Sequence, residues 1–504
     1  MTAGGPIRFT ADFLHRHRVF LLGVAALACL IDVTSLVASY LAYPGYVDHG
    51  EPSIVTAAWR LLAGHPVYHP FADAERVTNV YGPYAYSVHA LMFAVLGPSI
   101  ASGKAAAAAV GIAFPLLVFW SQRRHGTAAA LLGLILASGF MLKAVPASLW
   151  NRPDIFLATL VAMAVWAMNG KGSDRARDLA IAVCAGVAVS MKIHAGVYFI
   201  PVVLCRVSGR GLRPFIEIGG VAAVVAFAPF LLPVFPLPSY LEWFAHVAGK
   251  PTAASAAGRF LYHGLFQIAP ALLPFLDGKF RARLRPWPER LYFWSYFGGI
   301  VLLIPLAAKP GAGPYYLFPF TAITIDLLLR HAATTLHPRL VQAGAFVLAL
   351  IVVLPSIPIQ KRFQRSLNWD EARRIVADLR GVLERHPGRS IEMGVGTTIN
   401  GYRLTYGKVL LVFAGHPYHL DSATVGELRG MGIGMAPGTV RRIASCADDL
   451  WLVPKGESPF RMHSFYGGQA FDEGFRQAFE ATHDRQGSSE FFDFWGCPRG
   501  RTSG

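Results

Sequence analysis

Charge is scarce in this 504-residue chain, and the first conclusions follow from that scarcity. Only 15% of the residues are charged, whereas 54% are hydrophobic. A soluble chain of this length would carry roughly 25% charged residues. The composition therefore argues against a soluble globular protein and favours a protein that uses a lipid bilayer as its main solvent.

Acidic residues are the scarcer sign, with 30 Asp and Glu against 46 Lys and Arg, a net charge of +16. Such an excess can indicate nucleic-acid binding, but here the basic residues form short clusters between apolar runs. Clusters of that kind set the orientation of membrane segments. We therefore expect a membrane partner and no nucleic acid.

Cysteine is rare, and a cleavable signal peptide is not evident. Cys29, Cys184 and Cys205 lie in apolar runs and are expected to be small core residues. Cys446 and Cys497 lie in the polar C-terminal third and could pair if that third faces an oxidising compartment. The first apolar run is too long for a signal peptide and lacks an A-x-A exit, so a retained anchor is expected.

Apolar runs long enough to cross a bilayer need about 20 residues. The stretch YGPYAYSVHALMFAVLGPS is apolar but short, and we expect it to lie in the interface without crossing. The predicted crossings are 19–43, 102–120, 127–145, 154–169, 178–192, 195–206, 214–235, 261–276, 290–308, 314–329 and 339–358.

The basic clusters test this count of eleven. With the N-terminus inside, QRRHG, NGKGSDRARD, CRVSGRGLR, DGKFRARLRPWPER and LRHAATTLHPR all become cytoplasmic, as the positive-inside rule requires. The outer face then receives the loop at 44–100 and most of the isolated polar residues. The sequence therefore predicts an all-α polytopic membrane domain over 1–358.

The composition changes after about residue 359. An amphipathic helix, a Pro-Gly break and a short apolar strand begin this part, KVLLVFAGHPYHLD and ADDLWLVPKG are strand candidates, and TVGELRGMG and GTVRRIASC favour helices. We expect a small α/β extracytoplasmic domain over 359–504. GVGTTINGYR lacks the full phosphate-loop pattern and is interpreted as a turn.

Two carboxylates open the first outer loop. Asp48 and Glu51 are three residues apart at a helix start, where both can face one side and the helix dipole favours them. One of them could be a general base for a hydroxyl nucleophile. The alternatives are a simple helix cap, with Pro52 in the first turn, or part of a divalent-cation site that would need more ligands.

Other ionisable residues fall on the same predicted face. Arg152 and Asp154 could contact a phosphate and a hydroxyl, or form an interfacial ion pair that anchors a helix. Lys192 and His194 lie at another outer corner, where a snorkelling lysine and a structural histidine are the alternatives. Further candidates for binding a phosphate-bearing substrate are Tyr81, Arg259, His263, Lys309 and Tyr315.

The order of these motifs resembles a known family. A first crossing, an acidic outer loop, AWRLLAGHPVY, YGPYAY, a basic inner turn, RPD and K-x-HAG together resemble the GT-C membrane glycosyltransferases, in the branch of aminoarabinose transferases and protein O-mannosyltransferases. The similarity covers roughly residues 10–330. It implies an enzyme that moves a sugar from a polyprenyl-phosphate carrier to a lipid, glycan or protein acceptor outside the cytoplasmic membrane.

The resemblance also assigns expected roles. Asp48 matches the acidic residue of the first loop, Asp154 the acidic residue after the third crossing, and Arg259 with Tyr315 or Lys309 the contacts to the carrier phosphate. The chain departs from the family's paired "DE" or "DD", because His49 follows Asp48, so the choice between Asp48 and Glu51 stays open. No cofactor is implied, although a divalent cation is not excluded.

Two other functions fit a polytopic chain. A transporter or flippase of a lipid-linked sugar predicts ionisable residues at mid-membrane and two similar halves. Mid-span charge is sparse here, with Asp32 and Asp326 the nearest candidates, and the two halves are not similar. A membrane-anchored binding protein would place the working part in the C-terminal domain. The expected function is therefore glycosyl transfer, general-base assisted and inverting, at the outer face of the cytoplasmic membrane.

Overall fold

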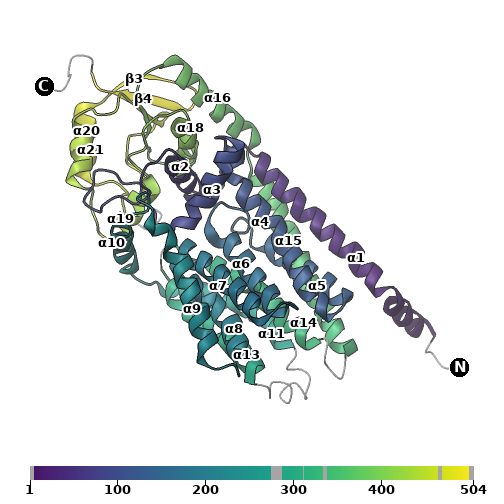
Figure 1. Cartoon of the computed structure of the whole chain (residues 1–504). Helices are drawn as coiled ribbons and strands as arrows, with labels where there is room; N and C mark the ends of the chain where they lie inside the picture. Colours follow the sequence, from purple (N-terminus) through teal and green to yellow (C-terminus); the bar gives the residue numbers. More distant parts are fainter. Residues whose placement is uncertain (1–4, 274–286, 310, 333–337, 464–467, 499–504) are drawn as a thin grey trace.

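A bundle of helices carries a smaller mixed unit at one end in the computed structural model, which describes residues 5–273, 287–309, 311–332, 338–463 and 468–498. The strands and the helices after residue 366 gather at that end, and the long first helix runs along one side of the bundle (Figure 1). The chain is mostly helical, as the sequence predicts.

The bundle is built from the following helices. They are α1 (Gly5–Ala42), α2 (Gly50–Leu62), α3 (Pro83–Leu96), α4 (Ile100–Gln122), α5 (Thr127–Lys143), α6 (Pro153–Asn169), α7 (Asp174–Met191), α8 (Gly196–Val207), α9 (Leu212–Phe227), α10 (Leu237–Ala248), α11 (Ala254–Leu272), α13 (Trp287–Ala307), α14 (Thr321–Ala332) and α15 (Pro338–Ser366). A 3₁₀ segment, η5 (Pro314–Phe320), leads into α14.

Four segments among the described residues are long and apolar enough to cross a membrane: Val19–Ala42, Ile100–His125, Leu212–Leu231 and Trp287–Ala307. Large apolar side chains on them are exposed, among them Phe20, Ile31, Val224 and Trp294. Such an apolar exterior is stable against lipid and not against water. The chain is thus a membrane protein with several candidate spans, and the count of eleven stays a prediction.

Parts of the charge argument lie outside the described residues. Most of DGKFRARLRPWPER (277–290) and the middle of LRHAATTLHPR (329–339) fall there. The stretch expected to lie in the interface forms α3, whose 14 residues are about 21 Å long at 1.5 Å per residue. That length is short of the ~30 Å hydrocarbon core.

The C-terminal unit holds a four-stranded sheet in the order β1-β2-β4-β3. Its elements are α16 (Trp369–Arg385), β1 (Ile391–Met393), α17 (Ile399–Leu404), α18 (Lys408–Phe413), α19 (Ser422–Gly430), α20 (Pro437–Ala444), β2 (Leu450–Pro454), α21 (Glu473–Thr482), β3 (Asp484–Ser488) and β4 (Phe492–Gly496). β1 pairs with β2 in parallel, and β4 runs antiparallel to both β2 and β3. The side chains of β2 are fully covered, which makes it the centre of the sheet.

One strand prediction in this unit is wrong. KVLLVF forms the helix α18, in which Lys408, Val409, Leu411 and Val412 are buried. That spacing is helical, and a short apolar run does not by itself distinguish a buried strand from a helix. The predicted helices at α16, α19 and α20 and the strands at β1 and β2 are present, while part of the stretch interpreted as a turn forms α17.

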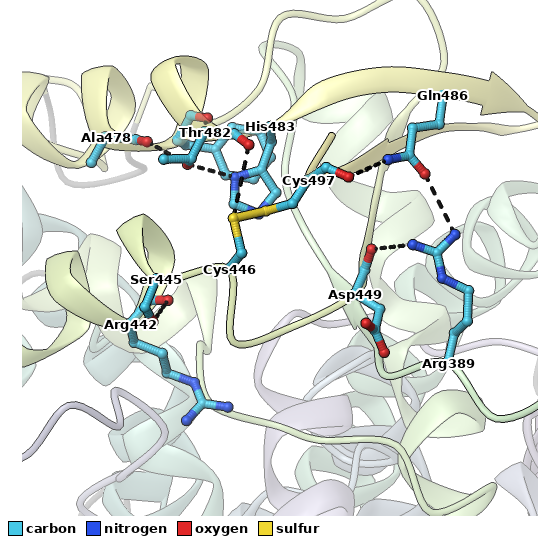
Figure 2. Close-up of a disulfide and its surroundings, with 11 residues drawn as sticks. Arg389, Arg442, Ser445, Cys446, Asp449, Ala478, Thr482, His483, Gln486 and Cys497 are labelled. Carbon is cyan, nitrogen blue, oxygen red and sulfur yellow. Dashed lines mark hydrogen bonds between the residues drawn. A yellow bond between two sulfur atoms is a disulfide. The ribbon is translucent and has the colours of Figure 1, made fainter. Parts of the chain in front are cut away.

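Cys446 and Cys497 form a disulfide between the end of α20 and the end of β4, with 6.1 Å between their Cα atoms. Thr482 and His483, at the end of α21, lie beside it (Figure 2). Cys29 and Cys184 are free and buried, as expected for core residues, and Cys205 is free and half-buried. The two cysteines of the C-terminal third are therefore oxidised, whereas the three in the apolar runs are free thiols.

The C-terminal unit is attached to the loop at 44–100, which the sequence predicts to be an outer loop. Arg76 bridges to Leu420 in parallel, with hydrogen bonds of 2.8 and 2.9 Å on either side. Deeper in this contact, Lys408 Nζ lies 2.6 Å from Asp421 Oδ1 and donates to Ser53 Oγ on α2 at 3.3 Å. A buried ion pair thus joins α18, the start of α19 and α2.

Replacing Lys408 with Met should destabilise the folded protein by about 3–5 kcal/mol, because it leaves the fully buried Asp421 carboxylate without its cation. The measurement is thermal or denaturant unfolding of the purified protein in detergent. Arg373→Met, which breaks an exposed pair with Asp370, is the matched control and should change nothing measurable. Equal free energies of unfolding for the two variants would contradict a stabilising role of the Lys408–Asp421 pair.

Candidate active site

Asp48 lies just before α2, at the point where the outer loop leaves α1. Its Oδ1 accepts the backbone N–H of Gly50 at 2.9 Å and lies 3.2 Å from Arg152 Nη1. About 15% of the side chain remains exposed. The carboxylate therefore accepts a backbone N–H at the start of α2, although the N-cap residue itself is His49, and it is not fully buried.

Glu51 has a different environment, since it is completely buried. It accepts backbone hydrogen bonds from Val47 at 2.8 Å, Asp48 at 2.9 Å and Asn151 at 3.2 Å, and a further one from the Tyr40 hydroxyl. Four donors occupy the acceptor positions of this carboxylate. Glu51 thus fixes the loop that presents Asp48 and ties it to the loop before α6.

Arg152 connects three separate segments. Its Nη1 contacts Asp48, and its Nη2 donates to the Tyr315 hydroxyl in η5 at 2.9 Å. The guanidinium lies 4.1 Å from the Trp150 ring centroid and 5.0 Å from that of Tyr315. Two aromatic faces therefore hold the plane of the cation, and Pro153 starts α6 directly after it.

A second carboxylate–cation pair lies beside the first. Asp154 Oδ1 is 3.2 Å from Lys192 Nζ, its Oδ2 accepts from Trp150 Nε1 at 3.0 Å, and the same oxygen is 3.9 Å from Arg152 Nε. Asp154 is 1% exposed. A buried carboxylate of this kind is stable only with such partners, and the two pairs together balance two negative charges with two positive ones.

Tyrosines close the site around Lys192. The ammonium lies 4.1 Å from the Tyr316 ring centroid, 5.4 Å from that of Tyr315 and 5.8 Å from that of Tyr81. His194 stacks near Tyr316 at 4.6 Å between ring centroids. Tyr81, Lys192, His194 and Tyr315 are thus brought to one cluster with Asp48, Arg152 and Asp154, on segments separated by up to 267 residues of chain.

Gly82 explains how the outer loop reaches Lys192. Its N–H donates to Met191 O at 3.1 Å, and a Cβ built on Gly82 would lie 1.7 Å from Ser190 O. Only glycine allows this approach of two backbones. The motif YGP therefore places Tyr81 against the end of α7 and lets Pro83 begin α3.

Three other candidates lie apart from this cluster. Arg259 and His263 are exposed side chains on α11, and Lys309 donates to Ala248 O at 2.5 Å. No hydrogen bond or ion pair links them to Asp48, Arg152 or Asp154 among the described residues. Their expected roles at the carrier phosphate stay predictions.

Sequence reasoning missed Lys104, which lies at the back of the site. It is fully buried on α4 and donates to Tyr40 O at 2.9 Å and Tyr43 O at 2.7 Å. Its ammonium also faces the rings of Tyr40, Tyr43 and Tyr46. A lone lysine inside the alanine-rich run GKAAAAAV was the available signal, because an ionisable residue in an apolar helix is rarely without a partner.

The electrostatics of the outer loop separate its two carboxylates. Burial alone would raise the pKa of Asp48, but Arg152, His49 and the Gly50 N–H outweigh it and hold that pKa below its usual range. Burial raises the pKa of Glu51, against the opposing effect of Tyr40 and Lys104. Asp48 is therefore the carboxylate that is ionised throughout the neutral range.

No metal is expected at this cluster, although a divalent-cation site was one alternative for Asp48 and Glu51. Within the described residues, the groups of three or more His, Cys, Asp or Glu side chains with ligand atoms close together lie in the C-terminal unit. Here each carboxylate has a side-chain cation as its partner. The expectation that no metal acts at this site stays a prediction.

Replacing Gly82 with Ala should lower the melting temperature of the protein in detergent, because the new methyl group collides with the Ser190 carbonyl and overpacking costs about 1–3 kcal/mol or more. Gly219→Ala on α9 is the control, since its Cβ meets nothing within 4 Å. An unchanged melting temperature for Gly82→Ala would contradict the close approach.

Comparisons with known proteins identify the fold. No protein-family model matches the sequence, and no curated protein matches it either. Two solved structures of ArnT from Cupriavidus metallidurans are similar with a TM-score of 0.56 at 14% identity. One, bound to undecaprenyl phosphate, covers 96% of this chain and 98% of that chain, and the other, in the apo state, covers 95% and 98%.

A weaker similarity, with a TM-score of 0.43 at 13% identity, relates 72% of the chain to 58% of the oligosaccharyltransferase of Archaeoglobus fulgidus. ArnT is a GT-C glycosyltransferase, and its similarity to this protein extends over both the helical bundle and the C-terminal unit. The resemblance inferred from the motif order is thus confirmed at the level of the fold, and the chain has the GT-C fold that it shares with ArnT.

Proposed function

We propose that this protein is a membrane glycosyltransferase that moves a sugar from a polyprenyl-phosphate donor to an acceptor hydroxyl. The observation that carries the proposal is the double pairing around Arg152, which places two carboxylates, two cations and three tyrosines in one cluster. A reaction in which a hydroxyl loses a proton and a phosphate leaves needs these groups together.

Asp48 is the general base in this proposal. An acceptor hydroxyl is far too weak an acid to ionise at neutral pH, so it needs a proton acceptor as it attacks. Asp48 is ionised and partly exposed, whereas Glu51 is buried with four donors already bound. Between the two carboxylates left open by the sequence, the geometry favours Asp48.

Arg152 and Lys192 bind the phosphate. Arg152 Nε is buried and has no hydrogen-bond partner within the described part of the chain, and Lys192 Nζ has a single hydrogen bond, to Asp154. Both cations therefore retain donors for phosphate oxygens. When a phosphate engages Arg152, its contact with Asp48 weakens, and the basicity of Asp48 rises at the moment a base is needed.

The reaction then balances as a single displacement. The acceptor oxygen forms a bond to the anomeric carbon while the bond from that carbon to the phosphate oxygen breaks, and polyprenyl phosphate leaves with the electron pair. Asp48 takes the hydroxyl proton and later releases it to solvent or to the departing phosphate. One displacement inverts the anomeric centre.

Two further observations support a lipid-linked donor and an outer site. The structurally similar ArnT was solved with undecaprenyl phosphate bound. A carrier of that kind stays in the bilayer at about 0.8 kcal/mol per buried CH₂, so its sugar is transferred at the membrane edge. The disulfide of the C-terminal unit is typical of an oxidising compartment, which supports the extracytoplasmic side of the cytoplasmic membrane.

Asp48→Asn should reduce sugar transfer by about 10²–10⁴-fold, the contribution of a positioned general base. The fold should survive, because the amide oxygen of Asn can still accept the Gly50 N–H. The measurement is transfer from labelled polyprenyl-phosphate sugars to a membrane extract by purified protein. Asp370→Asn, at an exposed position, is the control, and transfer by Asp48→Asn within twofold of wild type would remove Asp48 from the mechanism.

Arg152→Lys should lower transfer by about 10- to 100-fold, since one hydrogen bond to a charged group contributes about 1.5–3 kcal/mol and lysine cannot reach Asp48, Tyr315 and a phosphate together. The measurements are the initial rate of sugar transfer at saturating donor and the affinity of the variant for the donor. Arg213→Lys, on an exposed arginine, controls for the substitution. Full activity of Arg152→Lys would show that a point charge suffices at this position.

A further inference from the structure

A second cluster of ionisable side chains lies in the C-terminal unit, outside the site described above. Glu392 is the middle residue of β1, Asp448 lies two residues before β2, and His419 lies in the connection from α18 to α19. One ligand atom from each of these three side chains lies within 4.8 Å of the other two. Three distant parts of the unit thus meet at one point.

Only one of the two carboxylate oxygens of Glu392 has hydrogen-bond partners among the described residues. The side chain is 2% exposed, and its Oε1 accepts the backbone N–H of His419 at 2.7 Å and of Leu420 at 3.0 Å. Its Oε2 is buried without a hydrogen-bond partner among the described residues. A buried, unpartnered carboxylate oxygen is costly, and burial raises the pKa of Glu392 to about 7.

The neighbouring groups compensate the charge of the two carboxylates only in part. Asp448 is 3% exposed and accepts from Ser390 Oγ at 3.3 Å and Arg442 Nη2 at 3.2 Å. His419 Nδ1 has no hydrogen bond within the described chain, although it lies 3.5 Å from Glu75 Oε1. Arg60 pairs with Glu75. Within the described residues, the basic side chains beside Glu392 and Asp448 are then Arg442, which pairs with Asp448, and His419.

We propose that Glu392, His419 and Asp448 form a binding site for a divalent transition-metal cation of the Zn²⁺ type. Two carboxylates and one imidazole form a donor set that such ions accept, whereas Mg²⁺ and Ca²⁺ prefer oxygen ligands alone. The cation gives Glu392 Oε2 the partner that it lacks among the described residues, takes one ring nitrogen of His419 as a ligand, and neutralises the two buried carboxylates. Tetrahedral bonds of about 2.0–2.2 Å place ligand atoms roughly 3.3–3.6 Å apart, so the ligand atoms, which lie within 4.8 Å of one another, draw together when the ion binds.

The position of the site gives the ion a mechanical role. His419 and Leu420 belong to the segment that bridges to Arg76 of the outer loop, and Glu392 and Asp448 belong to the β1–β2 edge. The ion therefore fixes, against the β1–β2 edge, the segment that bridges to Arg76 of the loop at 44–100, and that loop also carries Asp48. This inference does not depend on glycosyl transfer, because ion binding is measured without substrate.

In a second group of potential metal ligands, the cysteines are already bonded to each other. Cys446, His483 and Cys497 also lie close together, but the two cysteines form a disulfide, and metal binding by cysteine requires a thiolate. Under non-reducing conditions, the Glu392 cluster is the group of the two that can bind the ion.

The test uses the full chain in detergent, stripped with EDTA and kept oxidised. Titration with Zn²⁺ by calorimetry, and metal analysis after gel filtration, should give one ion per chain and a higher melting temperature. Glu392→Gln should bind at least 10-fold more weakly and lose the rise in melting temperature, while its stripped form melts no lower than stripped wild type, because the amide still accepts two backbone N–H groups. His463→Gln, at an exposed histidine, should bind as wild type does.

Two results would overturn the proposal. The first is the absence of Zn²⁺ binding by the stripped wild-type protein at micromolar concentrations. The second is binding that is equal in wild type and Glu392→Gln, which would place the ion elsewhere. If Glu392→Gln does not elute as a folded protein, His419→Asn is judged by the same two criteria.

Discussion

The structure depends most on the guanidinium of Arg152, which holds the first outer loop, the start of α6 and the segment η5 together. Asp48, Asp154 and Tyr315 come from these three places, and each contacts this one side chain. The rings of Trp150 and Tyr315 both lie against the guanidinium and restrict its orientation, so its donors have defined directions. A neutral or flexible residue here would leave two carboxylates without their common partner.

The C-terminal unit completes this arrangement from the other side of the outer loop. Lys408 reaches α2 and Asp421, and the bridge between Arg76 and Leu420 extends the contact along the loop. Glu51 and Lys104 therefore connect the loop to the helical bundle, and Lys408 and Leu420 connect it to the C-terminal unit. A loop clamped on both sides presents Asp48 in one position, which general-base catalysis requires.

Much of the fold could be predicted because apolar length and charge placement are local properties of the sequence. Sorting residues by side of the membrane placed Asp48, Arg152, Asp154, Lys192 and Tyr315 on one face, and these residues lie in one cluster. The same sorting could not separate them from Arg259, His263 and Lys309, because residues on the same side of the membrane can still lie far apart. Nor could it predict α18, because the largely apolar run KVLLVF fits a helix or a strand. It also could not find Lys104, whose hydrogen bonds go to backbone carbonyls at and just after the end of α1.

The central claim is that Arg152 and Lys192 receive the phosphate of a lipid carrier next to Asp48. The most direct measurement is a structure of the protein in lipid nanodiscs with a polyprenyl phosphate bound. The account predicts phosphate oxygens within about 3.2 Å of donors on both cations and an acceptor-sized space beside Asp48. A phosphate bound at the Arg259 and Lys309 side, without contact to Arg152 or Lys192, would contradict it.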